Sequence, residues 1–123
     1  MATHLVDQKR ATVQTPGATE TTLMAYTLLD ESLYTITAHV VAKSTGGDAK
    51  MFTITGAFKR TGGGGDTTMG SILNVVTPQG DVGAALWAAT LDVSGNDVRV
   101  RVTGVALTTI DWLCRIIADG LVP

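Results

Sequence analysis

The sequence contains few of the residues that indicate catalysis, metal binding or covalent cross-linking. Its 123 residues include one cysteine and two histidines, which excludes an intrachain disulfide framework and the usual zinc ligand sets. Long helix-forming side chains are also scarce, with two glutamates and four lysines. No apolar run approaches the roughly 18 residues of a membrane span, and residues 1–10 lack the apolar stretch of a signal peptide. We therefore expect neither a membrane partner nor a metal.

The small net charge argues against nucleic acid as a partner. The formal net charge is only −2, and phosphate contacts need a basic surface, so we expect no nucleic-acid binding. Apolar residues make up 45% of the chain and charged residues 16%, which is typical of a folded protein. The length fits a single domain that needs no disulfide or metal to fold.

The residues that are abundant favour β-structure. The chain has 20 threonines, 13 valines and 14 glycines, and β-branched side chains fit a pleated surface. Apolar and polar residues alternate along Tyr34–Lys43, Met51–Lys59 and Val98–Thr103. Shorter strand candidates are 23–28, 71–77 and 84–93. Turn-forming residues separate these runs at 45–48, 62–66, 78–81 and 94–97.

These patterns predict an all-β protein with an antiparallel β-sandwich of the jelly-roll or immunoglobulin-like type. We expect its core to contain Tyr34, Ile36, Val40, Phe52, Ile54, Phe58, Trp87, Val98, Val100, Val102 and Trp112. The segment 109–120 also fits a helix, because Ile110, Leu113, Cys114 and Ile117 fall at helical spacing. The β context favours a strand that buries Ile110, Trp112, Cys114 and Ile116.

The first 21 residues differ from the remainder. They are polar and contain a Pro16-Gly17 break, so we interpret 1–21 as an N-terminal arm, or a first edge strand followed by a loop. The sandwich domain would then span 22–123. The sequence suggests a partner-binding role for the arm, through Leu5, Val6, Lys9 and Arg10.

No set of residues predicts a catalytic, cofactor or small-molecule site. His39 lies on the threonine side of a predicted strand without a sequence partner, His4 lies in the arm, and Cys114 lies in an apolar run. We therefore predict that the protein is not an enzyme.

Other candidates have simpler structural explanations. The four glycines 62–65 precede Asp66 and not the Lys-Ser/Thr pair of a phosphate loop, so we expect a hairpin tip. The aspartates of the turns lack the spacing of a calcium loop; they are Asp48, Asp66, Asp81 and Asp97. Arg99 and Arg101 share a strand face that we expect to be solvated.

Several strands carry apolar residues on both faces. Val40-Val41, Val75-Val76 and Ile116-Ile117 are adjacent apolar pairs, whereas a small sandwich buries one face of each sheet. The second face needs another cover, so we predict a homo-oligomer and favour a trimer.

The order of several segments resembles a β-sandwich module of tailed-phage virion proteins, both tail fibres and small capsid-surface proteins. The similarity covers roughly 30–118 and carries no catalytic motif. Its segments are Ser32–Lys43, Met51–Arg60 with its closing basic pair, Gly83–Trp87, Val98–Gly104 and Thr109–Trp112.

The resemblance implies a function in the virion. A short module with its own methionine resembles a capsid decoration or cement protein, so the first expectation is a non-enzymatic protein that binds the major capsid protein and stabilises the head. Its expected location is the outer capsid surface, and the host cytoplasm before assembly. The alternative is a tail-tip or tail-fibre module that recognises a host-surface glycan or protein.

Overall fold

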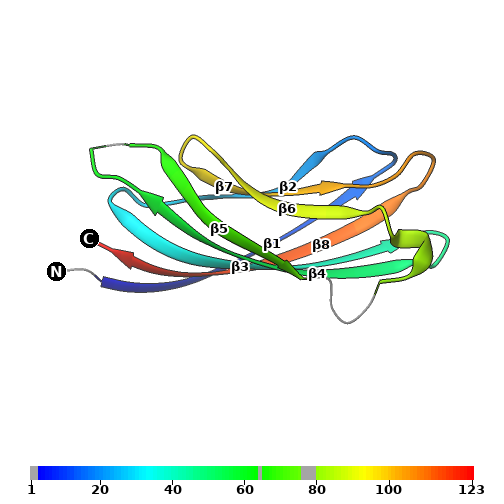
Figure 1. Cartoon of the computed structure of the whole chain (residues 1–123), viewed down its shortest axis with the longest axis horizontal. Helices are drawn as coiled ribbons and strands as arrows, with labels where there is room; N and C mark the ends of the chain where they lie inside the picture. Colours follow the sequence, from blue (N-terminus) through cyan, green and yellow to red (C-terminus); the bar gives the residue numbers. More distant parts are fainter. Residues whose placement is uncertain (1–2, 64, 76–79) are drawn as a thin grey trace.

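Two antiparallel sheets pack face to face (Figure 1). The computed structural model describes residues 3–63, 65–75 and 80–123. The larger sheet has the order β1-β8-β3-β4-β5, and the smaller sheet has the order β2-β7-β6. The strands are β1 (Thr3–Thr15), β2 (Thr21–Thr27), β3 (Ser32–Ser44), β4 (Ala49–Arg60), β5 (Thr67–Val75), β6 (Ala88–Ser94), β7 (Asp97–Thr103) and β8 (Ile110–Val122).

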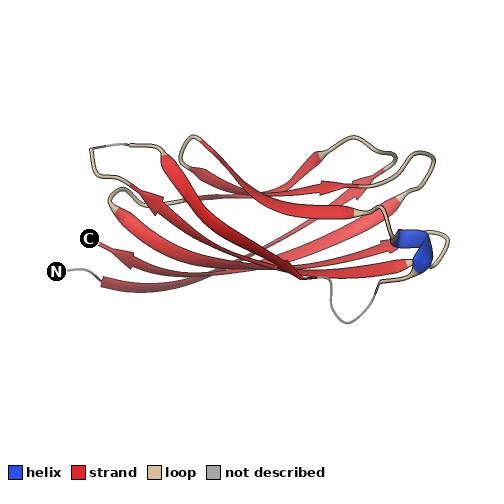
Figure 2. Cartoon of the chain, viewed as in Figure 1, coloured by secondary structure: helices blue, strands red, loops and turns tan. Residues whose placement is uncertain are grey.

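The predicted all-β antiparallel sandwich is thus confirmed, and Figure 2 shows strands over most of the chain. Within the described residues, the one helical element is η1, a short 3-10 helix at Val82–Ala84. The strand order differs from the four-plus-three arrangement of an immunoglobulin constant domain. No helix in the described part of the chain has the length and hydropathy needed to cross a membrane.

The core lies between the sheets and is built from alternate residues of β3, β4, β7 and β8 together with residues of β2 and β6. All eleven residues predicted for the core are buried. Trp112 is part of an aromatic cluster, with its ring centroid 6.3 Å from those of both Phe52 and Trp87. Its indole nitrogen donates a 2.9 Å hydrogen bond to the Thr15 hydroxyl, so the one polar atom of this side chain is satisfied.

The ambiguous segment near the C-terminus is a strand, as the β context favoured. Strand β8 lies between β1 and β3 and pairs with both along its length. Ile110, Trp112, Cys114 and Ile116 are buried on one face, which is the face expected for a strand. Two flanking strands therefore decide between two patterns that the local sequence allows equally.

The N-terminal residues Thr3–Thr15 form the edge strand β1 and not a separate arm. Each of these residues has a partner in β8, from Thr3 opposite Val122 to Thr15 opposite Ile110. The boundary placed between 21 and 22 therefore does not divide an arm from a domain, and the edge-strand alternative describes the structure. The polar sequence of β1 reflects its position, because one of its edges has no neighbouring strand.

Some sequence-based predictions fall on residues outside the described ranges. They are Gly64 within the predicted turn 62–66, Val76 and Thr77 at the end of the strand candidate 71–77, and Pro78 and Gln79 in the turn 78–81.

Candidate interaction surface

The outward side of the larger sheet is the most distinctive surface of the molecule. We define the outer face as the outward-pointing residues of β1, β8, β3 and β4, which lie in rows across the sheet because directly paired residues of antiparallel strands point to the same side. From one end to the other, its rows are His4–Leu121–Leu33–Lys59, Val6–Asp119–Thr35–Ala57, Gln8–Ile117–Thr37–Thr55, Arg10–Arg115–His39–Thr53, and Thr12–Leu113–Val41–Met51.

Large apolar side chains are exposed at both ends of the outer face. Leu33 and Leu121 are each 51% exposed at one end, and Val41 and Leu113 are 40% and 47% exposed at the other. The solvated side of an antiparallel sheet usually carries polar residues, so four exposed aliphatic side chains on two neighbouring strands depart from the normal pattern. Contiguous exposed apolar surface is characteristic of an interaction site.

A basic row crosses the same face between these apolar ends. Arg10 lies directly opposite Arg115, and Arg115 lies opposite His39. Like charges placed directly opposite each other destabilise a sheet. Among the described residues, neither arginine has a carboxylate within ion-pair distance. This row therefore carries a positive charge that is not paired with a carboxylate within the described part of the chain.

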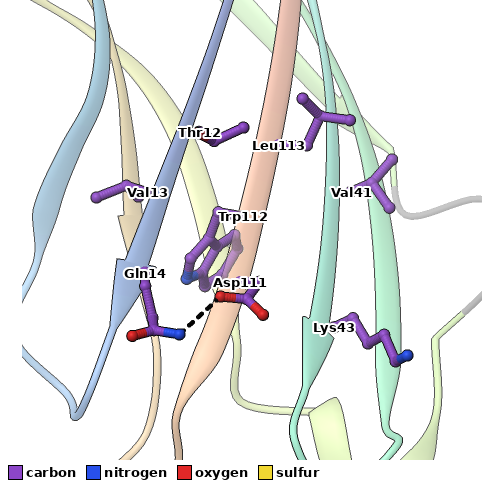
Figure 3. A pocket seen from close by; sticks show the side chains of 8 residues that line it. All are labelled: Thr12, Val13, Gln14, Val41, Lys43, Asp111, Trp112 and Leu113. Carbon is purple, nitrogen blue, oxygen red and sulfur yellow. Dashed lines mark hydrogen bonds between the residues drawn. The ribbon is translucent and has the colours of Figure 1, made fainter.

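A depression of about 600 Å³ lies at the end of the outer face that carries Val41 and Leu113 (Figure 3). Leu113 and Val41 line its apolar part, while Gln14, Asp111 and Lys43 line its polar part. The Gln14 side-chain amide donates a 2.9 Å hydrogen bond to Asp111, which fixes both side chains across β1 and β8. The depression is thus apolar toward the middle of the sheet and polar at its end.

The four residues predicted for partner binding divide between the two sides of β1. Val6 and Arg10 belong to the outer face, and Val6 is 60% exposed. Leu5 points inward and packs against the core. Lys9 also lies on the inward side, where its ammonium group donates a 2.7 Å hydrogen bond to the Ala25 carbonyl of β2. Leu5 and Lys9 therefore make contacts within the fold, whereas Val6 and Arg10 point outward, and a partner-binding role of these residues stays a prediction.

Asp7 and Lys9 together connect β1 to the smaller sheet. The Tyr26 hydroxyl donates a 3.0 Å hydrogen bond to Asp7, close to the Lys9 contact with β2. Burial and the hydrogen bond to Asp7 both raise the pKa of Tyr26 well above its ordinary value. Polar residues thus join the two sheets where the sandwich would otherwise be open at its edge.

The residues considered for chemistry are spread over the molecule. His39 lies on the outer face and is partly exposed, and His4 lies 3.9 Å from Asp119 at the opposite end of that face. Cys114 is fully buried, and burial raises the pKa of its thiol to about 12. A thiol with that pKa is protonated at neutral pH and is a poor nucleophile.

The buried thiol has a measurable consequence at alkaline pH. Its pKa is raised from 9.0 in the unfolded chain, so folding favours the protonated form, and this contribution is complete below pH 9 and is lost as the pH rises toward 12. We expect the titration of Cys114 to lower the free energy of unfolding by about 1 kcal/mol between pH 8 and pH 10. Urea unfolding at both pH values measures this loss.

The Cys114→Ala variant is the control, because it removes the titrating group. It should be less stable at pH 8 but should show a smaller decrease between the two pH values. An equal decrease in both proteins would contradict the assignment to Cys114.

The remaining polar candidates have structural contacts. Asp81 accepts a 2.9 Å hydrogen bond from the Ala49 amide, and Asp97 accepts one from Thr27. Arg99 forms two 2.8 Å hydrogen bonds with Asp92, and Arg101 pairs with Glu20 at 2.9 Å. Over residues 3–63, 65–75 and 80–123, no three metal-ligating side chains gather at one point.

Sequence comparison gives no relative: no family model matches the chain, and no curated protein matches it. Among solved structures, it is similar to a tailspike protein from Acinetobacter baumannii bacteriophage Fri1, described as a capsular polysaccharide depolymerase. The TM-score is 0.46 at 9% identity, over 99% of this chain and 18% of the tailspike chain. The tailspike protein of Acinetobacter baumannii phage AM24 gives a TM-score of 0.37 at 10% identity, over 94% of this chain and 26% of that one.

The first of these matches corrects one prediction. The sequence led us to exclude an enzyme, but a chain described as a depolymerase contains a region similar to this sandwich. The exclusion was therefore wrong as a conclusion from the sequence. Both matched proteins are described as phage tailspike proteins.

Proposed function

We propose that this domain is a protein-docking module of a phage virion, of the tail-spike or tail-fibre kind, and that it makes its contacts through the outer face. The observation that carries the proposal is the exposed apolar surface of Leu33, Leu121, Val41 and Leu113 around a basic row. Such a surface is suited to another protein, because apolar area drives association and uncompensated charge selects the partner.

The position of the aromatic residues favours a protein partner over a glycan. Both tryptophans, both tyrosines and both phenylalanines of the sequence are buried. None of these rings can stack on a sugar without unfolding part of the core. The glycan part of the tail-fibre alternative therefore has no aromatic platform in this domain.

A head decoration protein is the second candidate function. In that reading the N-terminal arm would anchor the protein to capsid protein or to a neighbouring subunit, but Thr3–Thr15 is paired along its length with β8. The outer capsid location stays a prediction, and we place it after the tail reading. The resemblance to tailed-phage modules is common to both.

The test uses a phage that carries this gene. Purified particles would be separated into heads and tails, and the chain located by mass spectrometry. We expect it in the tail fraction, and we expect particles that lack it to keep their DNA after osmotic shock but to adsorb poorly. Particles that adsorb normally but lose DNA would favour the head reading.

A matched pair of variants tests the surface itself. Leu113→Asp changes the outer face, whereas Leu86→Asp changes a side chain that is 81% exposed beside η1. Incorporation into particles should fall for the first and stay normal for the second, with circular dichroism confirming that both are folded. Normal incorporation of the Leu113 variant would overturn the proposal.

A further inference from the structure

We infer that the outer face is self-complementary and joins two copies of this chain face to face, about a two-fold axis beside Ile117. The inference rests on the proposed use of this face for protein contact and names the partner as a second copy. It replaces the trimer that the sequence favoured with a symmetric pair.

The pattern of strand β8 carries the inference. Its outward residues are, in order, Leu113, Arg115, Ile117, Asp119 and Leu121. Reversing this order leaves a leucine at each end and Ile117 at the centre. It places Asp119 where Arg115 was and Arg115 where Asp119 was. The apolar residues of the strand are therefore symmetric about Ile117, and the two residues that flank Ile117 on this face have charges of opposite sign.

A two-fold axis in the plane of the interface uses this symmetry. It lays β8 on the β8 of the second copy in the opposite direction, with Ile117 against its own counterpart. Arg115 then meets Asp119 of the second copy, and Leu113 meets Leu121. The symmetry produces each of these contacts twice, as in an isologous interface.

The outward residues of strand β3 are arranged about the same two-fold axis. Thr37 is the register partner of Ile117, so it also lies close to the axis. Leu33 and Val41 lie equally far from Thr37 and are exchanged by the two-fold rotation, as Leu121 and Leu113 are in β8. Packed sheets cross at about 30°, which shifts the outer contacts of β8 toward its neighbouring strands, and on the β3 side the neighbour again presents an apolar residue, Leu33 or Val41.

The depression at one end of the outer face would meet exposed leucines of the second copy. Val41 and Leu113 line the apolar part of the depression, and the half-exposed Leu33 and Leu121 lie at the opposite end of the face. The rotation brings these two leucines of each copy to the depression of the other. An aliphatic side chain in a shaped site is the usual centre of a stable contact.

The charges support a second copy over an unrelated partner. Arg115 has no carboxylate partner among the described residues, and Asp119 has only the distant contact of 3.9 Å with His4. Pairing with a second copy neutralises both in one step, and it places a carboxylate near the unfavourable pair of Arg10 and Arg115.

The size of the face is sufficient for a modest dimer. Four strands about 4.8 Å apart and nine residues of about 3.4 Å give roughly 600 Å² per copy, or about 1,200 Å² in total. That area is at the lower end of the range for specific interfaces. We therefore expect a dimer that dissociates on dilution.

Charge reversal tests the pairing directly. Sedimentation of the intact chain, from micromolar to millimolar concentration, should give a particle of twice 12.8 kDa. Arg115→Asp and Asp119→Arg should each weaken the dimer by about a hundredfold, because like charges then meet. The double variant should restore it, since the exchanged charges again face each other. A matched control is Val82→Asp, at a residue that is 94% exposed away from the face.

Cross-linking tests the position of the axis. Only a residue close to the axis meets its own counterpart, so a short bifunctional maleimide that spans the roughly 10 Å between packed sheets should join Ile117→Cys of the two copies, and it should not join Val82→Cys. The native Cys114 is buried and should not interfere.

A monomer at millimolar concentration, a trimer, or a double variant that stays dissociated would each overturn the inference. If the chain is monomeric but Leu113→Asp still fails to enter particles, this inference fails and the proposed function stands. A dimer whose Leu113→Asp variant enters particles normally would overturn the proposed function instead.

Discussion

Replacing Trp112 with alanine should lower the free energy of unfolding by about 3–5 kcal/mol, the usual range for removing a large buried aromatic ring. The side chain is 1% exposed and contacts both Phe52 and Trp87, so the cavity would lie within the buried aromatic cluster. The Thr15 hydroxyl would also lose its donor. Small domains have a total stability of only about 5–15 kcal/mol, so this variant should be close to unfolding.

Urea unfolding followed by circular dichroism measures this effect, because the far-ultraviolet signal does not depend on the missing indole. The matched control is Asp111→Ala, one residue earlier on the exposed side of β8. It should change the stability by less than about 1 kcal/mol. A loss below about 2 kcal/mol for Trp112→Ala would show that the core can close over the cavity.

Replacing Lys50 with methionine should have the second largest effect, a loss of about 3 kcal/mol. The Lys50 ammonium group donates hydrogen bonds of 3.1 and 2.9 Å to the carbonyls of Ala85 and Trp87. It also lies 5.2 Å from the centre of the Phe52 ring. Methionine keeps the volume of the stem but leaves both carbonyls without this donor.

The same unfolding experiment measures this loss, and hydrogen exchange locates it. The Trp87 amide, bonded to the Ala84 carbonyl, should exchange faster in the variant because the connection from η1 to β6 is no longer fixed to β4. Lys43→Met, at an exposed lysine of the neighbouring strand, is the control and should be nearly neutral. Unchanged exchange at Trp87 would contradict the role of Lys50.

Alternating residues made the sandwich and its core predictable from sequence. Tyr34, Ile36 and Val40 recur at every second or fourth position of one strand, and that period requires no knowledge of the neighbouring strands. The same rule assigned the buried side of β8 once a strand was assumed. Adjacent apolar pairs such as Val40-Val41 and Ile116-Ile117 also signalled correctly that the outward side is partly apolar.

Strand β1 could not be predicted in the same way, because its inward positions include Asp7 and Lys9. Their partners are the Tyr26 hydroxyl and the Ala25 carbonyl in the other sheet, and nothing in the local sequence of β1 indicates those contacts. In the sequence, polar residues whose hydrogen-bond partners lie in the other sheet look the same as polar residues of a solvated arm.

The arrangement of the outer face was also beyond sequence reasoning. The row that places Arg10 beside Arg115 depends on the register of β1 against β8, and these residues lie far apart in the chain. The alternation of β8 was visible, but its symmetry becomes meaningful only when Ile117 is known to be outward and to lie beside Thr37. Register is a tertiary property, and sequence alone does not determine it here.

The pairing of the two terminal strands also determines how the domain responds to force. Thr3 lies opposite Val122, so the start of β1 and the end of β8 lie side by side (Figure 1). A pull applied at these ends acts across the β1–β8 ladder and opens it one residue pair at a time. Only a few hydrogen bonds resist at any moment, whereas a pull along the strands would load many of them together. In a virion component, the domain would thus resist tension poorly at its own termini, and any load is better carried through the broad surface of the sheet.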